Sequence, residues 1–271
     1  MKAKGFGSES PLSVRNLTVR YGRVVALAGV SLEIPRGAVY VLLGRAGAGK
    51  SSLARCLLGS QKPTAGEAFY LGRNARRSLL AKLLRRLGVA PRIPPGELPK
   101  GEAPLTGLAR AFGSRPEALV LDEPTGALDP AAARAFFKEL ARGRPPGTTV
   151  LLLTSDPEGA GRIATHVGIL REGRLAVSGE IGEVLRGFRR IRYRNEVTEE
   201  RTAYGTELDA FDAVRVKVRG WGVDAVVSNF DDEAFAALTA TEGVVDAEAE
   251  ALSLGDIFLA VAGGQLKREG P

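Results

Sequence analysis

The stretch GRAGAGKS, residues 44–51, decides the fold of this chain. It has the spacing of a phosphate-binding P-loop, in which a glycine-rich turn ends in lysine followed by serine or threonine. The apolar residues 39–43 come before it and predict a buried strand, and residues 52–58 follow and predict a helix that ends near Gly59. In the order strand, glycine loop and helix, backbone N–H groups and the helix N-terminus together bind an anion. We therefore expect an α/β fold with a phosphate site at this loop.

The last two residues of the loop carry its expected chemistry. Lys50 is expected to reach the β- and γ-phosphates of a bound nucleotide, and the Ser51 hydroxyl is expected to ligate Mg²⁺. The alternative is a glycine-rich turn that fits the spacing by chance, and the flanking strand and helix argue against it. The expected ligands are therefore ATP and Mg²⁺.

Composition and charge set broad limits on the class of protein. The chain has 271 residues, of which 44% are hydrophobic and 25% charged, as in ordinary globular proteins. Its one cysteine excludes a disulfide framework, and no apolar run reaches the length of a membrane-spanning helix. The N-terminus lacks the apolar core of a signal peptide. The net charge of +7 admits nucleic acid or anionic lipid as a partner, but the arginines are spread along the chain, which favours solvated surface positions.

A second motif follows another apolar run, residues 118–121. Asp122 and Glu123 come directly after it, so the end of a predicted strand holds both carboxylates. Asp122 is expected close to the Mg²⁺ ion, and Glu123 is expected to polarise the water that attacks the γ-phosphate.

The residues PTGALDP at 124–130 extend this motif, and the combined pattern LDEPTGALD after a P-loop resembles the nucleotide-binding subunits of ABC transporters. The resemblance covers residues 12 to about 180. It implies that residues 126–129 form the loop that crosses a dimer interface. It also implies that Tyr21 stacks on adenine; the alternative for Tyr21 is an ordinary strand tyrosine.

These motifs define the candidate site. The residues expected to bind the nucleotide are Tyr21, Gly44, Arg45, Ala46, Gly47, Ala48, Gly49, Lys50, Ser51, Ser52 and Asp122. The candidate catalytic residues are Glu123 and Lys50, and the candidate Mg²⁺ ligands are Ser51 and Asp122.

The resemblance implies a P-loop NTPase domain of the ABC type. The order of predicted strands and helices favours a mixed, mainly parallel sheet with antiparallel N-terminal strands, followed by a small α+β domain. The expected division is a flexible N-terminus at 1–11, an ATP-binding domain at 12–187, a C-terminal domain at 188–264 and a tail at 265–271. Strands are predicted at 12–21, 24–34, 67–71, 118–121, 148–154, 166–170, 174–178, 188–196, 213–219, 223–230 and 244–251. Helices are predicted at 78–87, 105–112, 131–141, 158–165, 231–238 and 254–262, with an irregular segment at 90–104. Residues 252–259 resemble the end of the ATPase subunits of ABC-2 type exporters.

Three parts of the family pattern are altered: the signature, the helical subdomain together with the glutamine that begins it, and the histidine after the strand at 148–154. Residues 98–102, LPKGE, stand where the family has LSGGQ, and Pro99 has neither an N–H nor a hydroxyl to offer a phosphate. Only 48 positions (98 − 50) separate Lys50 from Leu98, about half the usual interval, so most of the helical subdomain is missing. Arg92 stands where a metal-binding glutamine is expected. Ser155 replaces the expected histidine, and the sole histidine, His166, is expected to be a surface or structural residue.

Three functions remain open from the sequence. The favoured one is an ATP-binding subunit of an exporter-like transport system that hydrolyses Mg·ATP slowly if at all. It would lie on the cytoplasmic face of the membrane, bound to a transmembrane permease and paired with itself or with another ABC ATPase. The second is a non-hydrolytic regulatory subunit that pairs with a complete ABC ATPase. The third, and least favoured, is a soluble ABC protein that acts on nucleic acid.

Overall fold

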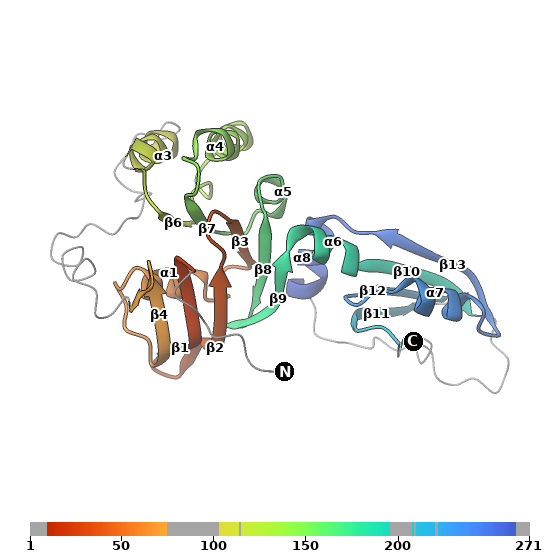
Figure 1. Ribbon diagram of the computed structural model, residues 1–271. Helices are drawn as coiled ribbons and strands as arrows, with labels where there is room; N and C mark the ends of the chain where they lie inside the picture. The colour runs from red at the N-terminus through yellow and green to blue at the C-terminus, as the bar shows by residue number, and fades with distance from the viewer. Residues whose placement is uncertain are drawn as a thin grey trace. The chain divides into compact units, whose positions relative to one another are not determined.

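The computed structural model describes residues 10–74, 103–113, 115–195, 208, 210–219 and 222–263 (Figure 1). The chain divides into two compact units, Met1–Ser178 and Gly179–Pro271. The predicted helix at 78–87, Arg92, the signature positions 98–102 and the tail at 265–271 lie outside the described residues. Within the described residues, no helix has both the length and the apolar character needed to cross a membrane.

A central sheet with a parallel core positions the P-loop. Its strand order is β6-β7-β3-β8-β9, and β3 runs parallel to both of its neighbours, as β6 does to β7. The strands are β3 (Val39–Gly44), β6 (Ala118–Asp122), β7 (Thr149–Thr154), β8 (His166–Arg171) and β9 (Arg174–Glu180). Every residue of β3 and β7 is buried, because helices and other strands cover both faces of a parallel sheet. The α/β P-loop NTPase fold predicted from the sequence is therefore confirmed.

A second, antiparallel sheet contains the two strands that come before the P-loop, as predicted, and two strands that follow it. Its order is β2-β1-β4-β5, with strands β1 (Leu12–Tyr21), β2 (Val24–Ile34), β4 (Ala65–Tyr70) and β5 (Arg73–Asn74). The turn between β1 and β2 uses Gly22 with φ +58°, a conformation that glycine adopts without strain. One continuous apolar core joins this sheet to the central sheet and to helix α1.

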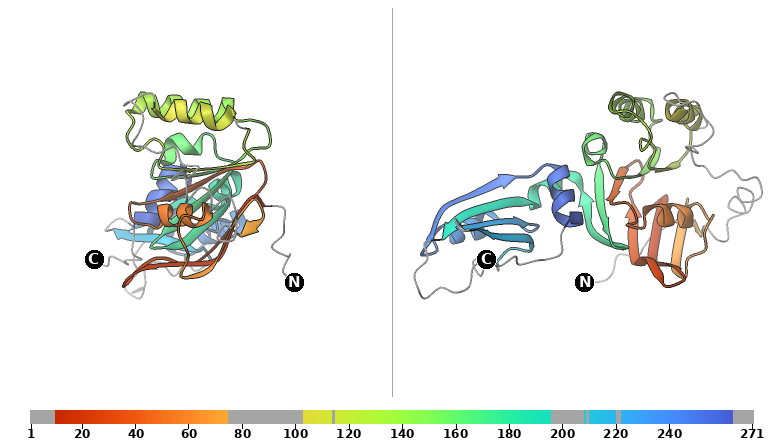
Figure 2. Two further views of the ribbon diagram at one scale, coloured as in Figure 1. Left: turned by 90° about the vertical axis from the view of Figure 1, so that its left-hand side faces the viewer. Right: turned by 180° about the vertical axis from the view of Figure 1, so that it is seen from behind.

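In the described part of the first unit, the strands are connected by the helices α1 (Lys50–Leu57), α3 (Ala103–Gly113), α4 (Pro130–Gly143) and α5 (Pro157–Gly161). The sequence placed Pro104 in an irregular segment, which was wrong, because α3 begins at Ala103 and the first turn of a helix accepts proline. The prediction for α5 was too long, because its glycine-rich sequence favours helix weakly. Helices α3 and α4 lie side by side (Figures 1 and 2).

The second unit contains an antiparallel sheet of order β11-β12-β10-β13, as expected for a small α+β domain. Its elements are α6 (Ile181–Gly187), β10 (Arg189–Asn195), β11 (Ala213–Arg219), β12 (Gly222–Val227), α7 (Asp232–Thr239), β13 (Val244–Ala251) and α8 (Leu254–Gly263). Strand β12 ends three residues earlier than predicted, because Asp231 caps the start of α7.

The two faces of this sheet differ in character. Ile191 and Tyr193 of β10 lie in an apolar core with residues of β12 and α7. The arginines that alternate with them form ion pairs instead, Arg190 with Asp224 and Arg192 with Glu250. This alternation is the usual arrangement of a sheet with one buried face.

Candidate functional site

The P-loop leaves the end of β3 and enters α1, and its backbone conformation at two glycines, together with close packing at Gly49, explains why glycine stands there. Gly47 and Gly49 have φ +80° and +106°, which side-chain-bearing residues rarely adopt. A Cβ atom on Gly49 would lie 2.7 Å from Leu27 Cδ2 and closer still to the carbonyl oxygen of Ala26. Strand β2 therefore backs the loop so tightly that only glycine fits at position 49.

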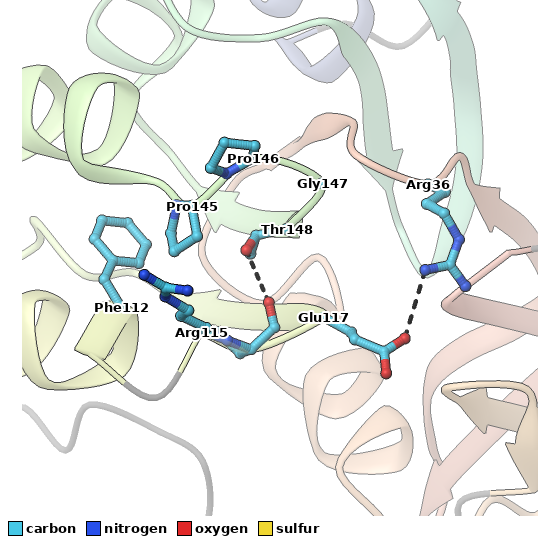
Figure 3. A pocket seen from close by; sticks show the side chains of 9 residues that line it. Arg36, Phe112, Arg115, Glu117, Pro145, Pro146, Gly147 and Thr148 are labelled. Atoms are coloured by element: carbon cyan, nitrogen blue, oxygen red, sulfur yellow. Dashed lines mark hydrogen bonds and ion pairs between the residues drawn. The ribbon is translucent and has the colours of Figure 1, made fainter.

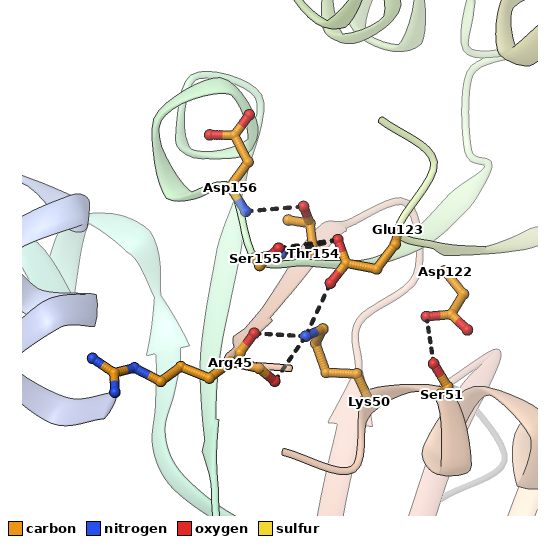
Figure 4. Close-up of polar contacts among 9 residues, drawn as sticks. Arg45, Lys50, Ser51, Asp122, Glu123, Thr154, Ser155 and Asp156 are labelled. Atoms are coloured by element: carbon orange, nitrogen blue, oxygen red, sulfur yellow. Dashed lines mark hydrogen bonds and ion pairs between the residues drawn. The ribbon is translucent and has the colours of Figure 1, made fainter. Parts of the chain in front are cut away.

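Lys50 is buried and fully engaged within the protein. Its side chain is 6% exposed, and Nζ donates to the carbonyl oxygens of Gly44 at 2.6 Å and Arg45 at 3.2 Å. Nζ also forms an ion pair with Glu123 Oε1 at 2.9 Å (Figure 4). An ammonium group has three donors, so these contacts use all of them.

The two predicted Mg²⁺ ligands are in contact. Ser51 Oγ donates a hydrogen bond of 3.1 Å to Asp122 Oδ1, which brings the start of α1 to the end of β6 (Figure 4). A hydroxyl and a carboxylate are hard oxygen donors of the kind that Mg²⁺ prefers, and the ion completes its coordination with water and substrate phosphates. The donor set therefore fits a Mg²⁺ ion bound together with a nucleotide.

Glu123 is held at both its backbone and its side chain. It adopts φ +47°, a left-handed conformation that costs roughly 1–2 kcal/mol for a residue other than glycine. Its N–H donates to the carbonyl of Leu153 at 2.8 Å, and its own carbonyl accepts from Gly126 N–H at 3.2 Å. Its Oε2 accepts hydrogen bonds from the Ser155 backbone N–H at 3.1 Å and the Ser155 hydroxyl at 3.4 Å. The residue that replaces the expected histidine thus contacts Glu123 directly (Figure 4).

Tyr21 lies at the end of β1, and its hydroxyl contacts α1 and the segment after it. The hydroxyl donates to Gln61 Oε1 at 2.6 Å, accepts from Arg55 at 2.9 Å and lies 3.1 Å from Ser52 Oγ. Desolvation alone would raise the pKa of the Tyr21 phenol, but the hydrogen bond of Ser52 and the charge of Arg55 outweigh it and lower the pKa. The Tyr21 residue remains 45% exposed.

The structure brings most of the predicted site residues together at the carboxyl ends of β3 and β6. Arg45 and Ala46 are exposed on the loop, while Ala48 and Ser52 are buried beneath it. His166 lies at the opposite end of the central sheet, where its ring stacks on that of Tyr40 with centroids 6.3 Å apart. The structural role expected for His166 fits this position.

Sequence reasoning did not find Arg55 and Gln61. Arg55 lies on α1, three residues after Ser52, so helical spacing places the two side chains near one face of the helix. That spacing was the available signal for Arg55. No local pattern marks Gln61, whose contact joins positions 40 residues apart.

A separate cavity of about 560 Å³ lies at the other end of the strands, where β6 and β7 begin (Figure 3). The Thr148 hydroxyl donates to the carbonyl of Pro116 at 2.8 Å, and an ion pair of 3.5 Å joins Arg36 and Glu117 at its edge. None of the predicted site residues lines it, so it is distinct from the P-loop site.

Comparison with known proteins places this site in a family. The model of the family described as ABC transporter matches residues 27–92. The chain is 30% identical to the methionine import ATP-binding protein MetN of Mesorhizobium japonicum, over 67% of this chain and 64% of that protein. It is 31% identical to MetN of Thermobifida fusca, over 60% of this chain and 66% of that protein. The chain thus spans less than two thirds of the length of these relatives. Because both relatives are named for import, the exporter-like expectation is not confirmed.

Solved structures show the same fold. The dimeric ABC transporter cassette MJ0796 superposes with a TM-score of 0.53 and 19% identity, covering 63% of this chain and 98% of that one. The protein cbiO1 of Clostridium perfringens, part of an ABC transporter complex, gives a TM-score of 0.52 and 22% identity, covering 65% of this chain and 90% of that one. Members of this family bind ATP with Mg²⁺, and the P-loop, Ser51 and Asp122 provide the matching groups. Residues 27–92 match the ABC transporter family, and the chain shares its sequence pattern and fold with ABC transporter ATP-binding domains.

Proposed function

We propose that this chain is the ATP-binding subunit of an ABC transport system and that it hydrolyses Mg·ATP slowly if at all. The observation that carries the proposal is the meeting of Lys50 and Ser51 at the start of α1 with Glu123 and Asp122 at the end of β6. The loop N–H groups and the helix N-terminus receive the phosphates, and Ser51 and Asp122 hold the Mg²⁺ ion, which neutralises phosphate charge.

Glu123 is the proposed base in this reaction. When phosphate takes the place of Glu123 on Lys50, the freed carboxylate accepts a proton from the water that attacks the γ-phosphate, which yields ADP and phosphate. Two features favour slow turnover. Lys50 and Glu123 neutralise each other before the nucleotide arrives, and Ser155 supplies no positive charge to the transition state. The loss of one such donor lowers the rate by about 10²–10³.

The proposed partners follow from the same assignment. We place the chain on the cytoplasmic face of the membrane, bound to a transmembrane permease and paired with itself or with another ABC ATPase. The ending at residues 252–259 supports an exporter-like system, whereas the similar proteins named above support import. Identifying the permease that binds this chain would distinguish export from import.

A second candidate is a regulatory subunit that binds ATP without hydrolysing it and pairs with a complete ABC ATPase. The contact of Ser155 with Glu123 favours this candidate, because the family's histidine is absent from the one place where it would act. A role on nucleic acid has less support. Three arginines that contribute to the positive charge are already paired with acids of their own sheet: Arg190, Arg192 and Arg194.

Single-turnover hydrolysis of Mg·ATP, with the protein in excess over nucleotide, tests the proposal, and Lys50→Ala is the comparison. We expect slow formation of ADP by the wild-type chain and none by the variant. Binding of ATP without any product would favour the regulatory subunit. Absence of ATP binding by the wild-type chain would exclude both candidates.

A further inference from the structure

The phenol of Tyr21 is held at its tip by three side chains. A phenol hydroxyl has one donor and two acceptor positions, and here it donates to Gln61 and accepts from Arg55. Ser52 Oγ, at 3.1 Å, takes the remaining position. The hydroxyl therefore has no unused hydrogen-bonding position, and the ring is restrained while the residue stays 45% exposed.

The partners of Tyr21 are themselves anchored. Arg55 belongs to α1, and the Gln61 N–H donates to the carbonyl of Arg55 at 3.1 Å. The segment that follows α1 is tied to β1 just ahead of Tyr21, because Thr64 N–H donates to the carbonyl of Thr18 at 2.8 Å. The hydroxyl of Thr64 also accepts from the N–H of the residue before Tyr21, at 3.0 Å. The tyrosine and its partners thus form one fixed cluster between β1 and α1.

This cluster shares a helix with the phosphate end of the site. Helix α1 begins at Lys50, and Arg55 lies five residues further on, about 7.5 Å along the helix axis. A helix of this length moves as a unit, so the position of the Tyr21 ring is set relative to Lys50. A planar group attached to phosphates at Lys50 would therefore meet an aromatic surface in a fixed place.

We propose that Arg55 and Gln61 are positioning residues that hold the Tyr21 ring for stacking against the base of the nucleotide. They do not touch the ligand, and they make the site prefer a nucleotide to a bare polyphosphate. The proposal rests on the proposed function, because it assigns the base end of the same ATP site. A stacked base contributes about tenfold to affinity when the aromatic surface is already in place.

The alternative is that the cluster only stabilises the junction of β1 and α1. If the cluster is purely structural, breaking it lowers the melting temperature of the protein and reduces its affinity for every ligand of the loop by the same factor. A positioning cluster, when broken, lowers affinity for ATP and leaves affinity for a bare triphosphate unchanged. The ratio of the two affinities separates these roles.

The test uses isothermal titration of the full-length chain with Mg·ATP and with Mg·tripolyphosphate. The variants are Arg55→Ala, Gln61→Ala and Tyr21→Phe, where the last keeps the ring and removes all three hydrogen bonds. Arg55→Lys restores a cation, and Arg20→Ala is a matched control, because Arg20 is an exposed arginine of β1 next to Tyr21. Thermal melting of each variant checks that it is folded.

We expect Arg55→Ala and Tyr21→Phe each to weaken Mg·ATP binding about tenfold, with tripolyphosphate binding changed less than twofold. Arg55→Lys should recover part of the loss, and Arg20→Ala should bind like wild type. The double variant Tyr21→Phe with Arg55→Ala should lose no more than either single variant, because both changes break one cluster.

Several results would overturn the proposal. Unchanged ATP affinity in Tyr21→Phe would show that the hydroxyl bonds do not position the ring. An equal loss for ATP and tripolyphosphate would assign the cluster a structural role. A wild-type chain that binds tripolyphosphate as tightly as ATP would also contradict it while leaving the phosphate site in place. A wild-type chain that binds neither ligand would instead refute the proposed function.

Discussion

The two ends of the nucleotide site hold their side chains in opposite ways. At the phosphate end, Lys50 and Glu123 are each other's partners, so a phosphate must displace a carboxylate before it reaches the ammonium group. At the base end, the side-chain hydrogen bonds of Tyr21 are made by its hydroxyl, so a base that stacks on the ring breaks none of them. The difference indicates that phosphate binding exchanges one ionic partner for another, whereas the base surface is ready before the ligand arrives.

The largest expected effect tests whether the phosphate end depends on its glycines. Gly49→Ala places a methyl group against Ala26 and Leu27 in a backbone conformation of φ +106°. We expect the free energy of unfolding to fall by roughly 2–4 kcal/mol and ATP binding to be lost, because both strain and overlap act at this position. Chemical denaturation and ATP titration measure the two effects.

Gly47→Ala is the matched control for that variant. Gly47 has φ +80°, but a Cβ atom there meets nothing within 4 Å. Only backbone strain remains, at about 1 kcal/mol. Equal destabilisation by the two variants would show that the packing of β2 behind the loop is unimportant.

An intermediate effect is expected from Glu123→Gln, which removes the internal competitor for Lys50. Because a partly exposed ion pair contributes about 1 kcal/mol, ATP affinity should rise by roughly fivefold. Hydrolysis in a single turnover should fall, since the amide is not a base. Asp122→Asn, the adjacent isosteric change, should instead weaken Mg²⁺-dependent binding. Weaker ATP binding in Glu123→Gln would show that Glu123 does not compete with phosphate for Lys50. The phosphate end of the site would then no longer differ from the base end in this respect.

The smallest effect is expected from Ser155→Ala. The change removes a hydroxyl contact of 3.4 Å to Glu123 and keeps the shorter backbone bond of 3.1 Å. Because the backbone donor remains, we expect less than a threefold change in single-turnover rate. A loss greater than tenfold would show that the serine hydroxyl itself takes part in the reaction.

The sequence predicted those parts of the molecule that local pattern determines. The P-loop and its flanking strand and helix follow from residue spacing, as does the pairing of β1 with β2. Asp122 and Glu123 were placed correctly at a strand end. Because the carboxyl ends of the parallel strands β6, β7 and β3 lie at one edge of the sheet, that placement brings the two carboxylates near the P-loop.

The remainder depends on contacts between distant segments. Tyr21 meets Gln61 across 40 positions, and Ser155 meets Glu123 across 32. No periodicity in either segment records which side chain it will face, because the register of strands and the packing of α1 decide that. The sequence also did not predict the ion pair of Lys50 with Glu123. Each of the two residues was assigned a contact with the ligand, and neither was assigned a contact with its partner in the ion pair.

The lone cysteine has a practical consequence for work on the assembled protein. Cys56 is 1% exposed, and burial raises the pKa of its thiol to about 11, so at neutral pH about one thiol in ten thousand is the reactive thiolate. A cysteine introduced at an exposed position would therefore react with thiol reagents while Cys56 does not. Ala127, exposed in the segment expected at a dimer interface, offers such a position for cross-linking two copies without first removing the native cysteine.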